Sequence, residues 1–196
     1  MLRGHAESLA PMVQRIMLHA GMEFQALQRI AVTTGPGTFA GLRVGLAFAR
    51  ALGAGLRIPV AGITTLEVMA AEALAINSAP AWAIVTADAK REEIYLAACA
   101  AGGRLLVAPQ VVALAEMGMT VSAVAGQYGV SPALAGTAAH LAKPLLESIG
   151  YRPEDSGVRQ PNAIFLAMLA QGLQQVDTAR PLYLRPPDAK LPGEAH

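Results

Sequence analysis

The chain has 196 residues and a net charge of +1, so it is long enough for one domain or two small lobes with a buried core. Its Lys and Arg residues form no cluster, which argues against direct, tight binding of nucleic acid, because phosphate neutralisation needs clustered cations. A lone cysteine, Cys99, excludes an internal disulfide, and the opening residues lack the basic and apolar segments of a signal peptide.

Helices and strands are predicted to alternate along the first part of the chain, which is typical of an α/β protein. Apolar side chains three and four residues apart predict an amphipathic first helix, and short apolar runs predict strands. The expected elements are a helix over residues 5–20, a strand over 29–34, a glycine-rich turn and helix over 35–55, a strand over 58–63, and a helix over 65–75 that Thr64 or Thr65 caps.

The second part is expected to begin with a β-meander. The predicted elements are strands over 81–87, 94–99 and 104–107, a helix over 138–148 that Pro144 interrupts, and a last helix over 161–175 with Pro161 at its start. Residues 117–142 carry no Asp, Glu, Lys or Arg, and we interpret them as buried core and loops. The last residues of the proline-rich tail are predicted to be disordered.

The stretch GPGTFAGLRVGLAFARALGAG, residues 35–55, has the strand, glycine loop and helix layout that can hold a phosphate group. However, Gly35, Gly37 and Gly41 are spaced one residue too widely for the dinucleotide fingerprint. A phosphate loop also needs a Lys followed by Ser or Thr, and the first Lys of the chain is Lys90. These two departures from the known nucleotide-binding motifs argue against a nucleotide site in residues 35–55.

Small residues recur every four positions along the helix that follows this loop. Gly41, Gly45, Ala49 and Gly53 would form one smooth stripe that lets another element approach closely. Glycine inside a helix costs about 1 kcal/mol relative to alanine, so the stripe needs a compensating contact. That contact is either internal packing, which the spacing alone favours, or the helix of a partner protein.

No catalytic centre is apparent from the residues themselves. The four histidines form no pair at helical spacing, no G-x-S-x-G occurs, and Cys99 lies inside a predicted strand, where an inert buried thiol is expected. Asp88 and Glu93 flank a turn and are expected to be solvated. We therefore expect no metal, no cofactor and no reaction in this chain.

Residues 35–70 closely resemble the signature of the TsaB (YeaZ) family, which is required for threonylcarbamoyladenosine (t6A) modification of tRNA beside the anticodon. The family pattern is G-P-G-S-F-T-G-L-R, and here Thr38 replaces Ser and Ala40 replaces Thr. The stretches RGHAESLAPMV, DAKREEIYLA, QPNAIFLAMLA and PLYLR also agree, so the resemblance covers nearly the whole chain. The signature residues present are Gly35, Pro36, Gly37, Thr38, Phe39, Gly41 and Arg43.

This resemblance implies an actin/sugar-kinase/Hsp70-like α/β fold in two lobes. Family members normally begin with about three strands, and without these the strand over residues 29–34 is expected to lack neighbours, so the chain is expected to be N-terminally truncated. The expected divisions are the remainder of the first lobe over residues 1–75, a second lobe over 76–160, a helix over 161–176 that packs on the first lobe or between the lobes, and a tail over 177–196.

The resemblance also implies a non-catalytic subunit. In the catalytic relative TsaD, two histidines that bind the metal occupy the positions of Thr65 and Met69, and a hydroxyl and a thioether cannot replace two imidazoles. In TsaB-like proteins the first two helices pair with those of TsaD or of a second TsaB. The contacts expected here are Leu9, Met12, Ile16, Gly41, Gly45, Phe48 and Ala49.

Three hypotheses follow. The first is a cytoplasmic scaffold that holds a TsaD-like transferase in a productive conformation, joins a TsaE-like ATPase in a larger complex, can form a homodimer, contacts tRNA only indirectly and does not enter a membrane. The second is an ATP-dependent kinase or transferase of the same superfold. The third is a fragment without a stable function, as the missing strands suggest.

Overall fold

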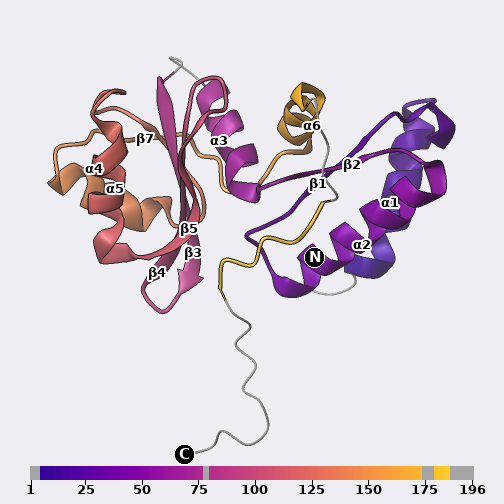
Figure 1. The fold of residues 1–196 in the computed structure, drawn as a ribbon, viewed down its shortest axis with the longest axis horizontal. Helices are drawn as coiled ribbons and strands as arrows, with labels where there is room; N and C mark the ends of the chain where they lie inside the picture. The colour runs from indigo at the N-terminus through magenta and orange to yellow at the C-terminus, as the bar shows by residue number, and fades with distance from the viewer. Residues whose placement is uncertain (1–4, 77–79, 174–178, 186–196) are drawn as a thin grey trace, which may run out of the picture.

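The computed structural model describes residues 5–76, 80–173 and 179–185, which form two α/β lobes (Figure 1). The helices are α1 (His5–His19), α2 (Phe39–Leu56), α3 (Thr65–Ala75), α4 (Met117–Ala125), α5 (Ala139–Ser148) and α6 (Ala163–Gly172). The strands are β1 (Ile30–Thr33), β2 (Val60–Ile63), β3 (Trp82–Lys90), β4 (Glu93–Ala100), β5 (Leu105–Ala113), β6 (Ala133–Ala135) and β7 (Glu154–Asp155). Short 3-10 helices cover Phe24–Ala26 and Leu114–Glu116.

The first lobe is built on a parallel pair of strands, β1 and β2, in which Ile30 lies opposite Val60. Helix α2 covers one face of this pair and α6 covers the other, while α1 lies beside α2 on the side away from the second lobe (Figure 1). Among the described residues, no strand pairs with the second edge of β1, and all four β1 side chains are half-buried.

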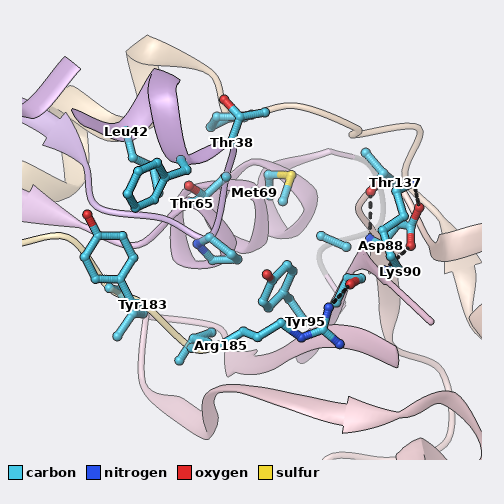
Figure 2. Close-up of a pocket in the computed structure, with 18 of the residues that line it drawn as sticks. Thr38, Leu42, Thr65, Met69, Asp88, Lys90, Tyr95, Thr137, Tyr183 and Arg185 are labelled. Carbon is cyan, nitrogen blue, oxygen red and sulfur yellow. Dashed lines mark hydrogen bonds and ion pairs between the residues drawn. The ribbon is translucent and has the colours of Figure 1, made fainter. Parts of the chain in front are cut away.

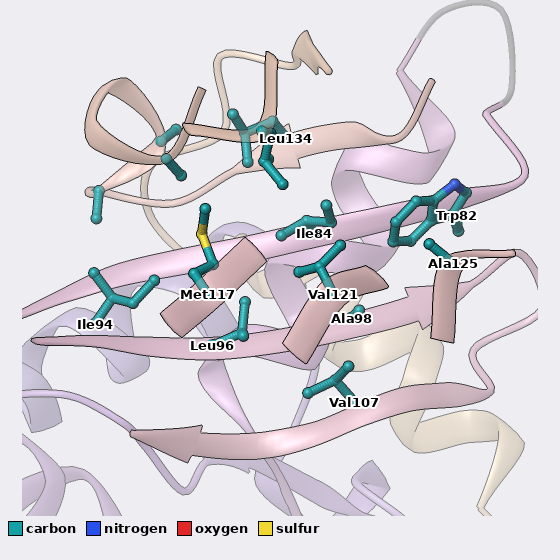
Figure 3. Close-up of a cluster of buried hydrophobic side chains, with 14 residues drawn as sticks. Trp82, Ile84, Ile94, Leu96, Ala98, Val107, Met117, Val121, Ala125 and Leu134 are labelled. Carbon is teal, nitrogen blue, oxygen red and sulfur yellow. The ribbon is translucent and has the colours of Figure 1, made fainter. Parts of the chain in front are cut away.

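The second lobe contains a five-stranded sheet in the order β5-β4-β3-β6-β7. Strands β3 and β4 form an antiparallel hairpin, and β6 pairs in parallel with β3. Helices α4 and α5 cover one face, where Trp82, Met117 and Leu134 lie in a fully buried cluster (Figure 3). The indole N–H of Trp82 donates to the Gly129 carbonyl at 3.1 Å, which satisfies the polar atom of this large side chain.

Helix α3 contributes to the cores of both lobes. Leu66 and Met69 pack with β3, β4 and β6 of the second lobe, while Val68 joins the first-lobe core with Ile63 and Ala170. The helix begins at the predicted residue because the Thr64 hydroxyl accepts from the Glu67 N–H, and the Glu67 carboxylate accepts from the Thr64 N–H. This reciprocal cap fixes the first turn of α3 at the junction of the two lobes.

The structure confirms the α/β fold and corrects several local predictions. Helix α4 lies in the stretch interpreted as buried core and loops, and its buried face agrees with the first part of that interpretation. Its helical pattern was missed because Gly118 lies at its start and no charged residues mark one face. Pro144 lies inside α5 without interrupting it. Asn162, rather than a proline, caps α6, since its side chain accepts from the Ile164 N–H at 3.0 Å. The predicted end of the last helix beyond residue 173 and the tail beyond residue 185 lie outside the described residues.

Helix α2 is the one described helix that is long and apolar enough to cross a membrane by length and composition. Core helices of soluble proteins pass the same test. In this structure Leu46, Ala49 and Gly53 of α2 are buried, and the helix packs on β1 and β2.

Candidate functional site

The signature loop leaves β1 and forms the start of α2. The Thr38 hydroxyl accepts from the Gly41 N–H at 3.2 Å and caps the helix. A Cβ at residue 41 would lie 2.7 Å from that hydroxyl, so glycine is needed there for the cap. Gly35 has φ +113°, and a Cβ on it would lie 3.0 Å from the Leu42 side chain. The two glycines therefore have structural explanations.

An exposed cluster of aromatic and cationic side chains lies beside this loop. The Arg43 guanidinium stacks on the Phe39 ring, 3.7 Å from its centroid. The Arg43 Nε donates to the Tyr183 hydroxyl at 3.4 Å, and the Phe39 and Tyr183 ring centroids are 5.8 Å apart. Two signature residues thus hold a residue from the chain's last described segment.

A cleft of about 630 Å³ separates the two lobes (Figure 2). Its walls include the signature loop, the start of α3, the β3–β4 hairpin, and residues 159–161 and 182–185. Thr65 and Met69 lie on the α3 wall, one helical turn apart, and Met69 is 2% exposed. These are the positions that the resemblance matched to the metal ligands of TsaD. No group of three or more His, Cys, Asp or Glu residues that could hold a metal occurs in the part of the chain that the structure describes.

Several basic side chains that line the cleft form ion pairs with carboxylates. Lys90 pairs with Asp88, and the hydrogen bond from its side chain is the main cause that lowers the pKa of this carboxyl. The hydrogen bonds from Arg159 likewise lower the pKa of Asp155, and Arg185 pairs with Glu93. Asp88 is exposed, as expected, and both Asp88 and Glu93 take part in ion pairs. The lowered pKa of Asp88 is the opposite of what a general acid at neutral pH needs.

The stripe of small residues on α2 faces the chain's own sheet. Ala49 is 4% exposed, and a Cβ on Gly45 would lie 3.9 Å from the Val32 side chain. A Cβ on Gly53 would overlap the Val60 side chain. Internal packing therefore accounts for Ala49 and Gly53, whereas Gly41 makes room for the Thr38 cap. Ala49, which we expected to contact a partner, is covered by this chain itself.

Helix α1 exposes apolar side chains among polar ones. Met12 is 37% and Ile16 is 59% exposed, and these residues lie one turn apart. Leu9, another predicted contact, lies on the same face and is half-buried, while Met17 is buried. On α2 the predicted contacts Gly41 and Phe48 are half-buried. We call Leu9, Met12 and Ile16 the α1 stripe.

Sequence reasoning missed the role of Arg50 and of the segment 179–185. Arg50 lies on α2 and donates to the Ala179 carbonyl at 2.8 Å. The agreement of PLYLR with the family pattern was the one sign that this segment matters. It could not predict the contact with Arg50, because the two partners lie about 130 residues apart in the sequence.

Comparisons with known proteins place the chain in a family. A protein-family model described as "TsaD: tRNA N6-adenosine threonylcarbamoyltransferase" matches residues 1–148. An uncharacterized protein of Mycobacterium tuberculosis strain H37Rv is 33% identical over 189 residues, 96% of this chain and 78% of that protein. The tRNA threonylcarbamoyladenosine biosynthesis protein TsaB of Escherichia coli K12 is 35% identical over 95 residues, 48% of this chain and 41% of that protein. The solved structure of YeaZ from Pseudomonas aeruginosa superposes with a TM-score of 0.73 at 27% identity, covering 94% of this chain and 86% of YeaZ. The chain belongs to the TsaB/YeaZ family.

Family membership confirms the resemblance that the signature loop indicated. The TsaB/YeaZ match extends over both lobes, because the YeaZ superposition covers 94% of the chain. Within this TsaB/YeaZ fold, the interlobe cleft and the α1 stripe are the two features that are candidates for function.

Proposed function

We propose that this chain is a non-catalytic subunit required for t6A modification of tRNA, and that it binds and activates a TsaD-type transferase. The observation that carries the proposal is the α1 stripe: two large apolar side chains, Met12 and Ile16, are exposed one turn apart on a helix that packs against α2. Exposed apolar patches on small proteins commonly mark protein interfaces. The 35% identity to the E. coli TsaB supports the pathway.

The composition of the cleft supports the non-catalytic role. Thr65 and Met69 offer a hydroxyl and a thioether where the transferase is expected to have two imidazoles. Burial raises the pKa of the Cys99 thiol to about 12, with a further contribution from the charge of Glu67, so this cysteine is a poor nucleophile. The chain then contributes a surface, and the transferase performs the reaction.

The wider assembly follows from the same proposal. The subunit acts in the cytoplasm, joins a TsaE-type ATPase through the complex, and contacts tRNA only indirectly. A second copy of the chain can use the α1 stripe when the transferase is absent, because a two-fold pairing of the same face is the commonest form of homodimer.

Reconstitution of t6A formation tests this proposal. The TsaD-type transferase of the same organism is incubated with tRNA, a threonylcarbamoyl donor and the TsaE-type ATPase, with and without this chain. We expect t6A only when the chain is present, and none from the chain without the transferase. Threonylcarbamoyl transfer or saturable ATP hydrolysis by the chain alone would instead support the ATP-dependent enzyme.

A further inference from the structure

Three stretches that stand out in the sequence meet at the interlobe cleft: the signature loop, the DAKREE hairpin of β3 and β4, and PLYLR. Residues 179–185, which we call the strap, pass between the lobes, and residues 182–185 of it line the cleft (Figures 1 and 2). The proposed partner-docking function does not use the strap.

The first end of the strap is anchored in the first lobe. Ala179 is 3% exposed, and Arg50 donates to its carbonyl at 2.8 Å. A Cβ on Gly62 of β2 would lie 2.6 Å from the Thr34 side chain and 3.0 Å from the Ala179 Cβ. Glycine at residue 62 therefore makes room for the strap.

The middle of the strap holds the signature loop. The Leu182 N–H donates to the Thr34 carbonyl at 2.8 Å, directly before the loop. A Cβ on Gly35 would lie 3.2 Å from the Leu182 carbonyl oxygen, so the strap passes close to the loop backbone. Tyr183 packs against Phe39 and accepts from Arg43.

The far end of the strap reaches the second lobe. Arg185, labelled in Figure 2, donates to the Ala89 carbonyl of β3 at 2.6 Å. It also forms an ion pair with Glu93 of β4, so it contacts both strands of the hairpin. The Arg185 side chain is only 19% exposed, which protects these contacts from water.

We propose that the strap is a latch between the lobes, in which Arg185 holds the β3–β4 hairpin at a fixed distance from the signature loop and so sets the opening of the cleft. Helix α3 joins the lobes through apolar packing, which permits small rotations of one lobe on the other. The directional bonds of Arg185 remove that freedom on the side of the cleft opposite α3. Arg185 is thus a positioning residue.

Distance measurements between spin labels on the two lobes test the latch. Labels are attached to Ala47→Cys on α2 and Ser122→Cys on α4, which are both exposed positions, and the buried Cys99 stays unlabelled. We expect one narrow distance distribution in the otherwise unchanged chain. Arg185→Met should broaden it and shift its mean, while Arg180→Met, a matched change at an exposed arginine of the strap, should leave it narrow.

A second variant keeps the test decisive if Arg185→Met does not fold. Glu93→Gln preserves the size of the side chain but removes its charge. We therefore expect a distance distribution that is wider than that of the unchanged chain and narrower than that of Arg185→Met. Circular dichroism verifies that each variant is folded. A distribution that stays narrow in the folded Arg185→Met or, failing that, in Glu93→Gln would overturn the latch.

Discussion

Gly53 illustrates at the residue scale how the α2 stripe is used. Its missing side chain lets β2 approach α2, because a Cβ there would overlap Val60 and lie 3.1 Å from the Ile58 carbonyl. At Gly55, two positions further along the same helix, an added Cβ would meet no neighbouring atom within 4 Å. Identical residues in one helix therefore have opposite packing requirements.

Alanine substitutions at these two glycines should have effects of opposite sign. Gly53→Ala should lower the free energy of unfolding by about 1–3 kcal/mol, since the added methyl overpacks the helix–sheet contact. Gly55→Ala should raise it by up to about 1 kcal/mol, because alanine favours the helix. Urea denaturation measures both values, and equal effects at the two positions would contradict the internal role of the stripe.

The buried Cys99 predicts a specific loss of stability at high pH. The pKa of its thiol rises from 9.0 to about 12 in the folded chain, mainly through burial. Below pH 9 the thiol is protonated in both states, whereas between pH 9 and 12 it ionises only on unfolding. This thiol therefore lowers the free energy of unfolding by up to about 1.4 kcal/mol per pH unit in that range. Cys99→Ala should make the free energy of unfolding fall less steeply between pH 9 and 12. The same slope in the unchanged chain and in Cys99→Ala would exclude this contribution of the thiol.

Strand β1 is the weak element of the fold. Ile30 and Thr34 donate their N–H groups to β2, so the alternate residues Ala31 and Thr33 direct theirs to the opposite edge. No described strand covers that edge. Unpaired apolar edges are templates for association between chains.

Proline substitutions distinguish the two edges of β1. Thr33→Pro removes a donor from the open edge and should reduce concentration-dependent association while cooperative unfolding is retained. Val32→Pro removes a donor that faces β2 and leaves a carbonyl without its partner, which should cost about 1–3 kcal/mol of stability. Analytical ultracentrifugation and thermal denaturation provide the two measurements. If Thr33→Pro leaves association unchanged, the chains associate through a surface other than the open edge of β1.

Local signals determined how much of these elements the sequence predicts. The start of helix α3 was predicted correctly because a capping threonine and Glu67 mark it. The first hairpin of the second lobe was likewise clear from two apolar runs around a polar turn. Helix α4 carries no such marker, and the orientation of the α2 stripe depends on Val32 and Val60, which lie on other elements.

At the scale of the whole molecule, the apolar packing of α3 and the polar contacts of the strap both join the lobes. The cleft between them was not predictable from sequence, because Arg185 and Glu93 pair although they lie far apart along the chain. Helix α1, which carries the α1 stripe, lies away from this cleft (Figure 1). Partner docking and lobe positioning are therefore separable by mutation.

Binding of the TsaD-type transferase by α1 variants tests the central claim most directly. Ile16→Glu places a charge in the α1 stripe, and Met119→Glu is the matched control on α4, where the side chain is 73% exposed. Titration calorimetry should give the same affinity for the unchanged chain and for Met119→Glu. Burying an unpaired carboxylate should weaken Ile16→Glu at least about tenfold, which corresponds to about 1.4 kcal/mol. Equal affinities for all three proteins would contradict docking through the α1 stripe.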